Sequence, residues 1–206
     1  KGYLITDRKF AGSDTLATSY AISLAVKKLA PFHLLVAGRQ AIDGDTAQVG
    51  PQTAEKLNIP QVAYAEKLID VNESEITIKR RIERGVETVS AKYPLAVTVH
   101  GSADPCRPRH AKNLMTYKHA RTITELQNET KDYTDLYTAR PYLKIEEWSV
   151  EDIGADVEQL GLSGSPTKVK AIENVVFAAK ESKSLSSSDE DIESLMVELL
   201  ESHMIG

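Results

Sequence analysis

The chain alternates between two patterns of apolar positions. Short runs of apolar residues predict buried β-strands, at residues 3–6, 33–37, 61–64 and 95–99. Between the first three runs, apolar residues at helical spacing predict two helices, one from a cap at Ser13 or Asp14 to about residue 29 and one over residues 48–57. Two strand–helix–strand steps in succession predict an α/β fold with a doubly wound, mostly parallel sheet.

Two details of this pattern predict which side chains are buried. The uninterrupted apolar run from Leu34 to Ala37 is typical of a parallel strand that is buried on both faces. In the first helix, Leu16, Tyr20 and Leu24, together with the alanines between them, predict a wide apolar face.

From residue 76 the pattern changes to alternation, which predicts an antiparallel hairpin added to the sheet. Isoleucines alternate with polar residues over 76–82, Arg84 and Gly85 suit a turn, and apolar positions return over 86–91. The basic run at 79–81 is compatible with a phosphate site, although a solvated strand face is the more ordinary interpretation.

The loop after the second predicted strand, residues 38–50, has features of a phosphate-binding turn. Gly38 ends the strand, a polar loop follows, and the next helix begins near Gln48 with Pro51 in its first turn, where a missing N–H costs little. Free backbone N–H groups and the helix dipole at such a junction can meet a phosphate. From these residues alone an ordinary turn without a ligand is the favoured interpretation, because glycine and aspartate are common in turns and neither a Walker lysine nor the spacing Gly-x-Gly-x-x-Gly is present.

The sequence Ala-Ile-Asp-Gly-Asp-Thr-Ala-Gln-Val-Gly-Pro at residues 41–51 resembles the nucleotide loop of electron-transfer flavoprotein β subunits. The resemblance implies an adenine-nucleotide alpha-hydrolase-like fold and a site for the phosphate side of an adenine nucleotide. That nucleotide is AMP in the simple heterodimers and a second FAD in the electron-bifurcating ones, whose form of the loop this sequence resembles more closely. The residues implied to bind it are Gly38, Asp43, Gly44, Asp45, Thr46, Ala47, Gln48, Val49 and Gly50.

Two later segments extend the resemblance. The sequence Leu-Gly-Leu-Ser-Gly-Ser-Pro-Thr-Lys-Val at residues 160–169 is similar to a Gly-Leu-x-Gly-Ser-Pro-Thr-x-Val segment of the family. Residues 107–115 are similar to a loop that docks partner dehydrogenases, although Pro108 and His110 depart from its pattern and Ala111 replaces a larger apolar anchor. The docking residues implied by this resemblance are Arg107, Ala111, Leu114 and Met115.

The resemblance implies electron transfer as the β subunit of a heterodimeric electron-transfer flavoprotein of the bifurcating type. The chemistry that the resemblance implies uses no protein nucleophile: flavin would carry out the redox reaction, and the protein would position the flavin and tune its potential. NADH would supply electrons through FAD to two acceptors: an acyl-CoA dehydrogenase, by way of the α-subunit flavin, and ferredoxin or flavodoxin. The alternatives are a non-bifurcating β subunit that holds structural AMP, and a universal-stress-type module that binds ATP without flavin.

We expect three parts along the chain: a nucleotide-binding α/β domain at 1–118, an excursion and linker at 119–188, and an extended C-terminal helical arm at 189–206. The resemblance also begins in the middle of the family pattern, so we expect the family's N-terminal segment to be missing from this sequence.

The C-terminal arm follows a serine-rich stretch at 182–188, and Ser187 with Glu190 predicts a capping box. A stripe of apolar residues then recurs at helical spacing, at Ile192, Leu195, Met196, Leu199 and Leu200. A single helix cannot bury such a stripe, so we expect it to pack on another surface. In the family that surface is the α subunit, and the alternative is the sheet of this chain.

Charge and residue counts exclude several classes of binding partner and of metal or disulfide site. The net charge of −5 and pI of about 5.6 argue against binding to nucleic acid or to an anionic membrane. No apolar run approaches the roughly 20 residues of a membrane span. Cys106 is the single cysteine, which excludes an intrachain disulfide and fits a reducing cytoplasm. The histidines are scattered without the spacing of a metal site.

Overall fold

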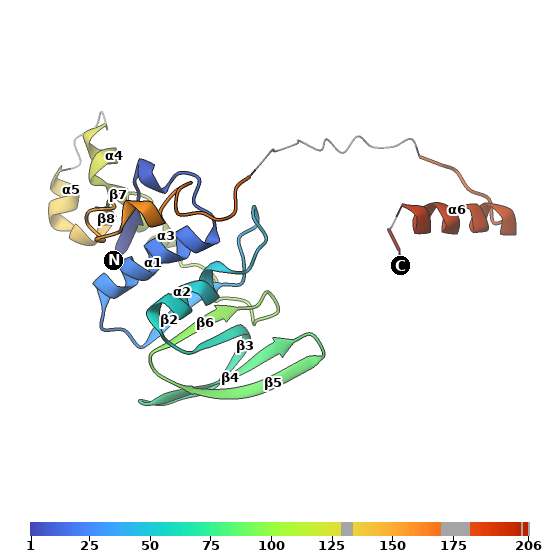
Figure 1. Ribbon diagram of the computed structural model, residues 1–206, viewed down its shortest axis with the longest axis horizontal. Helices are drawn as coiled ribbons and strands as arrows, with labels where there is room; N and C mark the ends of the chain where they lie inside the picture. Colours follow the sequence, from blue (N-terminus) through green and yellow to red (C-terminus); the bar gives the residue numbers. More distant parts are fainter. Residues whose placement is uncertain (129–133, 170–181, 203, 206) are drawn as a thin grey trace. The chain divides into compact units, whose positions relative to one another are not determined.

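The computed structural model describes residues 1–128, 134–169, 182–202 and 204–205. The chain forms two compact units, Lys1–Lys168 and Val169–Gly206. The first unit holds two β-sheets and helices α1 to α5, and the second holds helix α6 (Asp189–Glu201) (Figure 1). No helix within the described ranges is both long enough and apolar enough to cross a membrane.

The two sheets differ in strand direction. The smaller sheet is parallel, in the order β1 (Gly2–Ile5), β8 (Lys144–Trp148) and β7 (Arg121–Thr122). The larger sheet has the order β2 (Leu34–Gly38), β6 (Leu95–Val99), β3 (Gln61–Val71), β4 (Glu75–Ile82) and β5 (Gly85–Lys92). Its first three strands are parallel, and β3, β4 and β5 are antiparallel. The predicted α/β class, the mostly parallel strands and the added hairpin are therefore confirmed.

The pairing of β1 differs from the single sheet that the pattern predicts. Gly2 is paired with Ile145 of β8, whereas β2 is paired with β6 in the other sheet. Apolar periodicity identifies a segment as a strand but does not show which strand lies beside it. The partner of β1 comes from a part of the chain that lies far away in sequence.

The helices of the first unit differ greatly in length. The longer two, α1 (Thr15–Leu29) and α2 (Val49–Leu57), pack beside each other (Figure 1). The shorter ones are α3 (Ala111–Tyr117), α4 (Ile123–Gln127) and α5 (Thr134–Ala139), with 3-10 turns η1 (Arg8–Phe10), η2 (Pro141–Leu143) and η3 (Val157–Gln159). Asp14 caps α1, as predicted, because its side chain accepts hydrogen bonds from the N–H groups of Leu16 and Ala17.

The buried face of α1 is built mainly from small residues, so the predicted apolar face is confirmed at its alanines, Tyr20 and Leu24 pack against the core, and Leu16 departs from the prediction. Leu16 is 40% exposed, and Tyr20 and Leu24 are only partly buried. The fully buried positions are Ala17, Ser19, Ala21, Ser23 and Ala25. Small side chains let neighbouring elements approach closely, and the serine hydroxyls donate to helix carbonyls, so their burial leaves no unpaired donor.

Two separate groups of buried residues form the core of the first unit. One joins α1 to the segment that follows β8, through Ala21, Ala25, Trp148, Val150, Ile153 and Leu160. The other lies within the larger sheet, through Val62, Ala65, Ile76, Ile78, Leu95 and Val97. Residues 143–160, which the sequence analysis assigned to an excursion and linker, thus contribute directly to the core.

Strand β2 lies at the edge of the larger sheet, so the prediction that it is buried on both faces is wrong. Leu34 and Val36 are 37% and 60% exposed, whereas Leu35 and Ala37 on the opposite face are half-buried. The strand has β6 as its partner along one side. An uninterrupted apolar run does not distinguish a central strand from an edge strand with one covered face.

Helix α6 begins one residue later than predicted. Ser188, rather than Ser187, is its N-cap, and the Ser188 hydroxyl accepts a hydrogen bond from the Asp191 N–H at 3.3 Å. The Asp191 carboxylate in turn accepts from the hydroxyl and the N–H of Ser186, and the Ser186 hydroxyl chiefly lowers the pKa of Asp191. The apolar stripe is exposed, with Ile192 at 50%.

Candidate nucleotide site

The 38–50 loop leaves the carboxyl end of β2 and forms one wall of a cleft of about 510 Å³. Ligands of parallel α/β sheets bind beyond this end of the strands. Thr18 and Ile22 of α1 and Thr53 of α2 also line the cleft. The predicted site residues that line it are Gly38, Thr46, Ala47, Gln48, Val49 and Gly50, together with Arg39.

Asp43, Gly44 and Asp45 are not among the residues that line this cleft. The Asp43 carboxylate accepts a hydrogen bond from the Gly44 N–H at 2.9 Å, and the Asp45 N–H donates to the Ala41 carbonyl at 3.1 Å. These residues therefore shape the tip of the loop. Asp45 and Ala47 adopt φ values of 50° and 55°, a conformation that costs non-glycine residues about 1–3 kcal/mol and that is concentrated at functional sites.

The first turn of α2 presents backbone donors to the cleft. Gln48 is the N-cap but makes no side-chain capping bond, because its amide oxygen accepts from the Thr15 hydroxyl at 2.8 Å. Within the described part of the chain, the Val49 and Gly50 N–H groups have no protein acceptor. These donors, the helix dipole and the Arg39 guanidinium suit a phosphate or another anion.

The segment at residues 160–168 is attached to the start of α1, close to the same cleft. The Asp14 carboxylate accepts from the Thr167 N–H at 3.0 Å, and the Ser13 hydroxyl accepts from the Gly161 N–H at 3.0 Å. Burial opposes ionisation of Asp14, but backbone donors from Ala17, Thr167 and Leu16 outweigh it and lower the Asp14 pKa. The segment is therefore hydrogen-bonded to the start of α1, and Thr15 in the first turn of that helix donates a hydrogen bond to Gln48 of the 38–50 loop.

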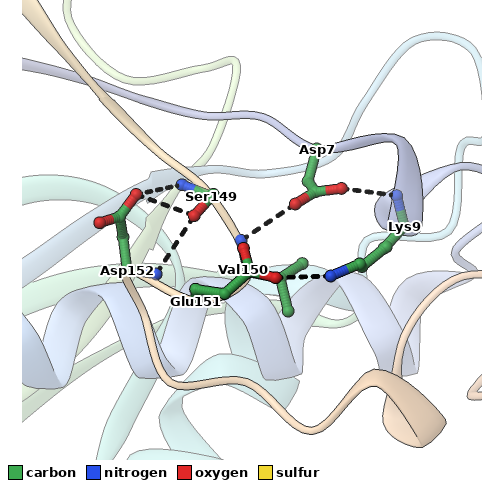
Figure 2. Close-up of polar contacts among 6 residues, drawn as sticks. All are labelled: Asp7, Lys9, Ser149, Val150, Glu151 and Asp152. Atoms are coloured by element: carbon green, nitrogen blue, oxygen red, sulfur yellow. Dashed lines mark hydrogen bonds and ion pairs between the residues drawn. The ribbon is translucent and has the colours of Figure 1, made fainter.

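A second polar cluster joins the carboxyl ends of β1 and β8 (Figure 2). The Asp7 carboxylate accepts from the Lys9 N–H at 3.0 Å and from the Val150 N–H at 3.3 Å. The Lys9 ammonium lies 2.6 Å from Glu151, which lowers the pKa of that carboxylate. Asp152 accepts from Ser149 in the same turn. These charges have partners within the cluster, so it acts as a structural clamp, and sequence reasoning missed it because its halves are far apart in the chain.

The predicted docking residues lie on an exposed segment. Ala111, Leu114 and Met115 belong to α3, and Arg107 precedes that helix. Leu114 and Met115 are 50% and 61% exposed. Their exposure is compatible with docking, which stays a prediction.

The comparison with known families decides the relationship of this chain. The family described as "Electron transfer flavoprotein domain" matches residues 1–127, a span that contains the 38–50 loop and the cleft. The chain belongs to the electron transfer flavoprotein family.

Several curated proteins of this family are similar to the chain. The electron transfer flavoprotein subunit beta of Clostridium acetobutylicum is 40% identical over 167 residues, which cover 81% of this chain and 55% of that protein. Protein FixA of Bradyrhizobium diazoefficiens is 32% identical over 203 residues, covering 95% and 62%. Subunit CarD of the caffeyl-CoA reductase-Etf complex of Acetobacterium woodii is 35% identical over 170 residues, covering 82% and 55%. The chain thus spans 55–62% of the length of these relatives.

Proposed function

We propose that the chain acts in electron transfer as the β subunit of a heterodimeric electron transfer flavoprotein. The observation that carries the proposal is the family match over residues 1–127, and it is supported by a cleft within this span that is lined by residues of the 38–50 loop. The similarity to proteins named subunit beta supports pairing with an α subunit. A module of the universal-stress type is not favoured, since the match is to the flavoprotein family.

The residues that would hold the nucleotide are those that line the cleft. The Val49 and Gly50 N–H groups and Arg39 would bind phosphate oxygens, and Thr46 would add a neutral hydroxyl donor. Ile22 and Val36 supply apolar wall on either side. When FAD is bound in such a site it supplies one- and two-electron redox chemistry, and AMP supplies none. The role of the chain is then to position the nucleotide and to set its electrostatic surroundings.

We propose the bifurcating form of this function, with FAD in the cleft and NADH as the electron donor. The support is the form of the loop at residues 41–51. The name of CarD places that relative in a complex with a caffeyl-CoA reductase, which supports an acyl-CoA dehydrogenase-type enzyme as one partner of this chain. Ferredoxin or flavodoxin would be the second acceptor. The alternative within the family is structural AMP in the cleft.

The test is to determine which nucleotides are bound to the protein when it is purified together with its α subunit. Visible absorbance and chromatography of the extracted nucleotides would give two flavins per heterodimer for the bifurcating form. One flavin with one AMP would instead indicate the simple form. Absence of both flavin and AMP would contradict the proposed function.

A pair of variants tests the placement of the nucleotide. Arg39→Gln removes a charge that lines the cleft, and we expect it to lower retention of the nucleotide held by this chain. Lys27→Gln removes a charge from the exposed last turn of α1 and serves as the control. An equal effect of the two variants would contradict a phosphate site at the 38–50 loop.

A further inference from the structure

A second cleft, of about 640 Å³, lies at the tip of the β4–β5 hairpin, outside the nucleotide site. It is lined by Tyr64 of β3 and by Arg80, Arg81, Ile82, Glu83 and Arg84. This cleft is shallow and largely open to solvent, so it could cover part of a ligand rather than enclose it. Three of these six lining residues are arginines and one, Glu83, is acidic, whereas the protein as a whole carries a net charge of −5. The basic run of the sequence thus contributes to a defined hollow.

Two of these arginines are held in place by carboxylates. Arg81 Nε donates to Glu66 at 2.5 Å, and the Glu66 side chain is only 8% exposed. Arg80 Nε lies 3.2 Å from Glu87. Both contacts use Nε, and among the described residues the terminal guanidinium nitrogens of Arg80 and Arg81 make no hydrogen bond or ion pair. Arg84, at the turn, makes no ion pair with any residue that the structure describes.

Glu66 is itself positioned by further contacts. It is the extra residue of a β-bulge, since Ala65 is paired with Arg80 and Lys67 with Lys79. Bulges redirect single side chains and are frequent beside functional sites. The Ser102 hydroxyl also donates to Glu66, and Ser102 lies 2.8 Å from Nδ1 of His100. The Ser102 hydrogen bond, followed by that of Arg81, lowers the Glu66 pKa, so the carboxylate stays charged toward Arg81.

Tyr64 has a strained backbone. Its φ of 60° is unfavourable for an aromatic residue, and its N–H donates to the hydroxyl of the buried Thr98 at 3.1 Å. Its ring meets that of His100 edge-on, with centroids 5.9 Å apart. Strain of this kind in a non-glycine residue points to a functional constraint. The result is a fixed aromatic side chain, 37% exposed, beside the arginines.

One end of the cleft lies near the carboxyl ends of the parallel strands, because Ala65, beside Tyr64, is paired with Val99 of β6 and with Arg80 of β4. The parallel pairing of β3 with β6 ends at Ala65 and Val99, next to Tyr64 and His100. The 38–50 loop leaves β2, which is paired with the other side of β6, where Gly38 is level with Val99. The two candidate anion sites therefore belong to the same sheet and are separated by β6.

We propose that this second cleft binds the pyrophosphate of a nucleotide distinct from the one at the 38–50 loop. Guanidinium groups bind phosphate oxygens in a bidentate manner, and a fixed tyrosine ring offers a surface on which a base can stack. The geometry alone assigns the pyrophosphate. The further identification with a nicotinamide dinucleotide rests on the proposed function, which requires a mobile electron donor besides the resident nucleotide.

The experiment measures binding of inorganic pyrophosphate and of NADH to the purified protein by calorimetry, with competition between them. Arg84→Gln should weaken binding of both ligands at least tenfold, and Glu66→Gln, which frees Arg81, should weaken it by a smaller factor. Lys92→Gln removes an exposed charge from the same hairpin at the end away from the turn, where Lys92 is paired with Glu75, and should leave the affinity unchanged.

The outcomes distinguish failure of the second site from failure of the proposed function. Equal weakening by Arg84→Gln and Lys92→Gln would indicate a solvated basic strand face and would overturn the proposal, as would undetectable binding of pyrophosphate to the unaltered protein. Arg84-dependent binding of pyrophosphate without NADH binding would keep the anion site and reject the dinucleotide. Arg84-dependent binding in a protein that retains neither flavin nor AMP would leave the second site standing and reject the proposed function.

Discussion

Gly50 of α2 lies directly against Thr98 of β6. A β-carbon built on Gly50 would be 2.8 Å from Thr98 Cγ2, which is closer than a real contact permits. Gly44, at the tip of the same loop, has nothing within 4 Å of such a β-carbon. The two glycines of the candidate nucleotide loop therefore differ in whether a side chain would fit. At Gly50 the absence of a side chain lets the first turn of α2 approach the sheet, whereas Gly44 lies in open space.

The first prediction follows from this difference. Gly50→Val should destabilise the protein by about 1–3 kcal/mol, because the added atoms overpack the contact with Thr98. The displaced helix terminus should also retain less nucleotide. Gly44→Val should leave the free energy of unfolding nearly unchanged. Urea denaturation and quantification of retained nucleotide measure the two effects. Similar stability losses in both variants would contradict the packing argument, whereas nucleotide loss without destabilisation in Gly44→Val would show that the loop tip meets the ligand.

Local patterns were sufficient to predict most of the elements near the candidate site. The cap at Asp14, the extent of α1 and α2 and the position of the 38–50 loop depend on short-range signals, namely a capping side chain, helical periodicity and a glycine after a strand. Most of the residues expected at the nucleotide site do line one cleft. The exceptions are Asp43, Gly44 and Asp45, whose interactions are within the loop tip.

Long-range contacts could not be predicted in the same way. Trp148 is buried against α1, yet its strand reads Lys-Ile-Glu-Glu-Trp and resembles an exposed segment. The strain at Tyr64 and the bulge at Glu66 arise from pairing with β6 and β4, which no local pattern encodes. The cleft at Arg84 appears only when these strands lie together.

The second prediction concerns the tight turn that attaches residues 160–168 to α1. A β-carbon at Gly164 would lie 2.0 Å from the carbonyl carbon of Gln159, and backbone atoms cannot move aside as a side chain can. Gly164→Ala should therefore lower the stability by about 1–3 kcal/mol or more. For a chain of this size that corresponds to a loss of about 2–4 °C in Tm per kcal/mol.

Gly101→Ala is the matched control, because a β-carbon at Gly101 meets nothing within 4 Å. Thermal unfolding followed by circular dichroism should give a Tm close to that of the unaltered protein for this variant. If Gly164→Ala had the same Tm as Gly101→Ala, the turn would be able to rearrange, and the attachment of the segment to α1 would contribute little to stability.

The third prediction concerns the pH dependence conferred by Asp14. Its folded-state pKa is lowered, below an unfolded value of about 3.9, so the ionised carboxylate stabilises the folded state at neutral pH. This stabilisation should be lost as the pH falls from about 4 through the folded-state pKa. Asp14→Ala should cost about 0.5–2 kcal/mol at pH 7, in line with loss of an N-cap, and less at pH 3.

Urea denaturation of both proteins between pH 3 and pH 7 measures this difference. Asp70→Ala, which removes an exposed acidic residue from β3, accounts for the general effect of losing one negative charge. If the difference in the free energy of unfolding between Asp14→Ala and the unaltered protein stayed constant over the whole pH range, the stabilisation by the cap would not depend on the charge of Asp14.

The last prediction concerns the apolar stripe of α6. Ile192, Met196 and Leu200 are 45–51% exposed, and Leu195 is 36% exposed, so their apolar area stays in contact with water unless another surface covers it. Full burial of each such side chain is worth about 1.5–3 kcal/mol. We expect the proposed α subunit to provide that surface. Changing both Leu195 and Leu199 to Asp should therefore weaken the heterodimer strongly, because two charges would have to be buried in an apolar contact.

Ser194→Asp is the control, since it adds a negative charge to α6 on the side opposite the stripe. Size-exclusion chromatography reports the heterodimer, and circular dichroism reports the fold of the first unit, which has its own core and should be unaffected by either change. Dissociation by the double variant but not by Ser194→Asp is the expected result. The contrary result is an intact heterodimer in which the circular dichroism signal of this chain is lost. That result would mean that the stripe packs on its own chain, because its burial would then stabilise the fold of this chain and not the contact with the α subunit.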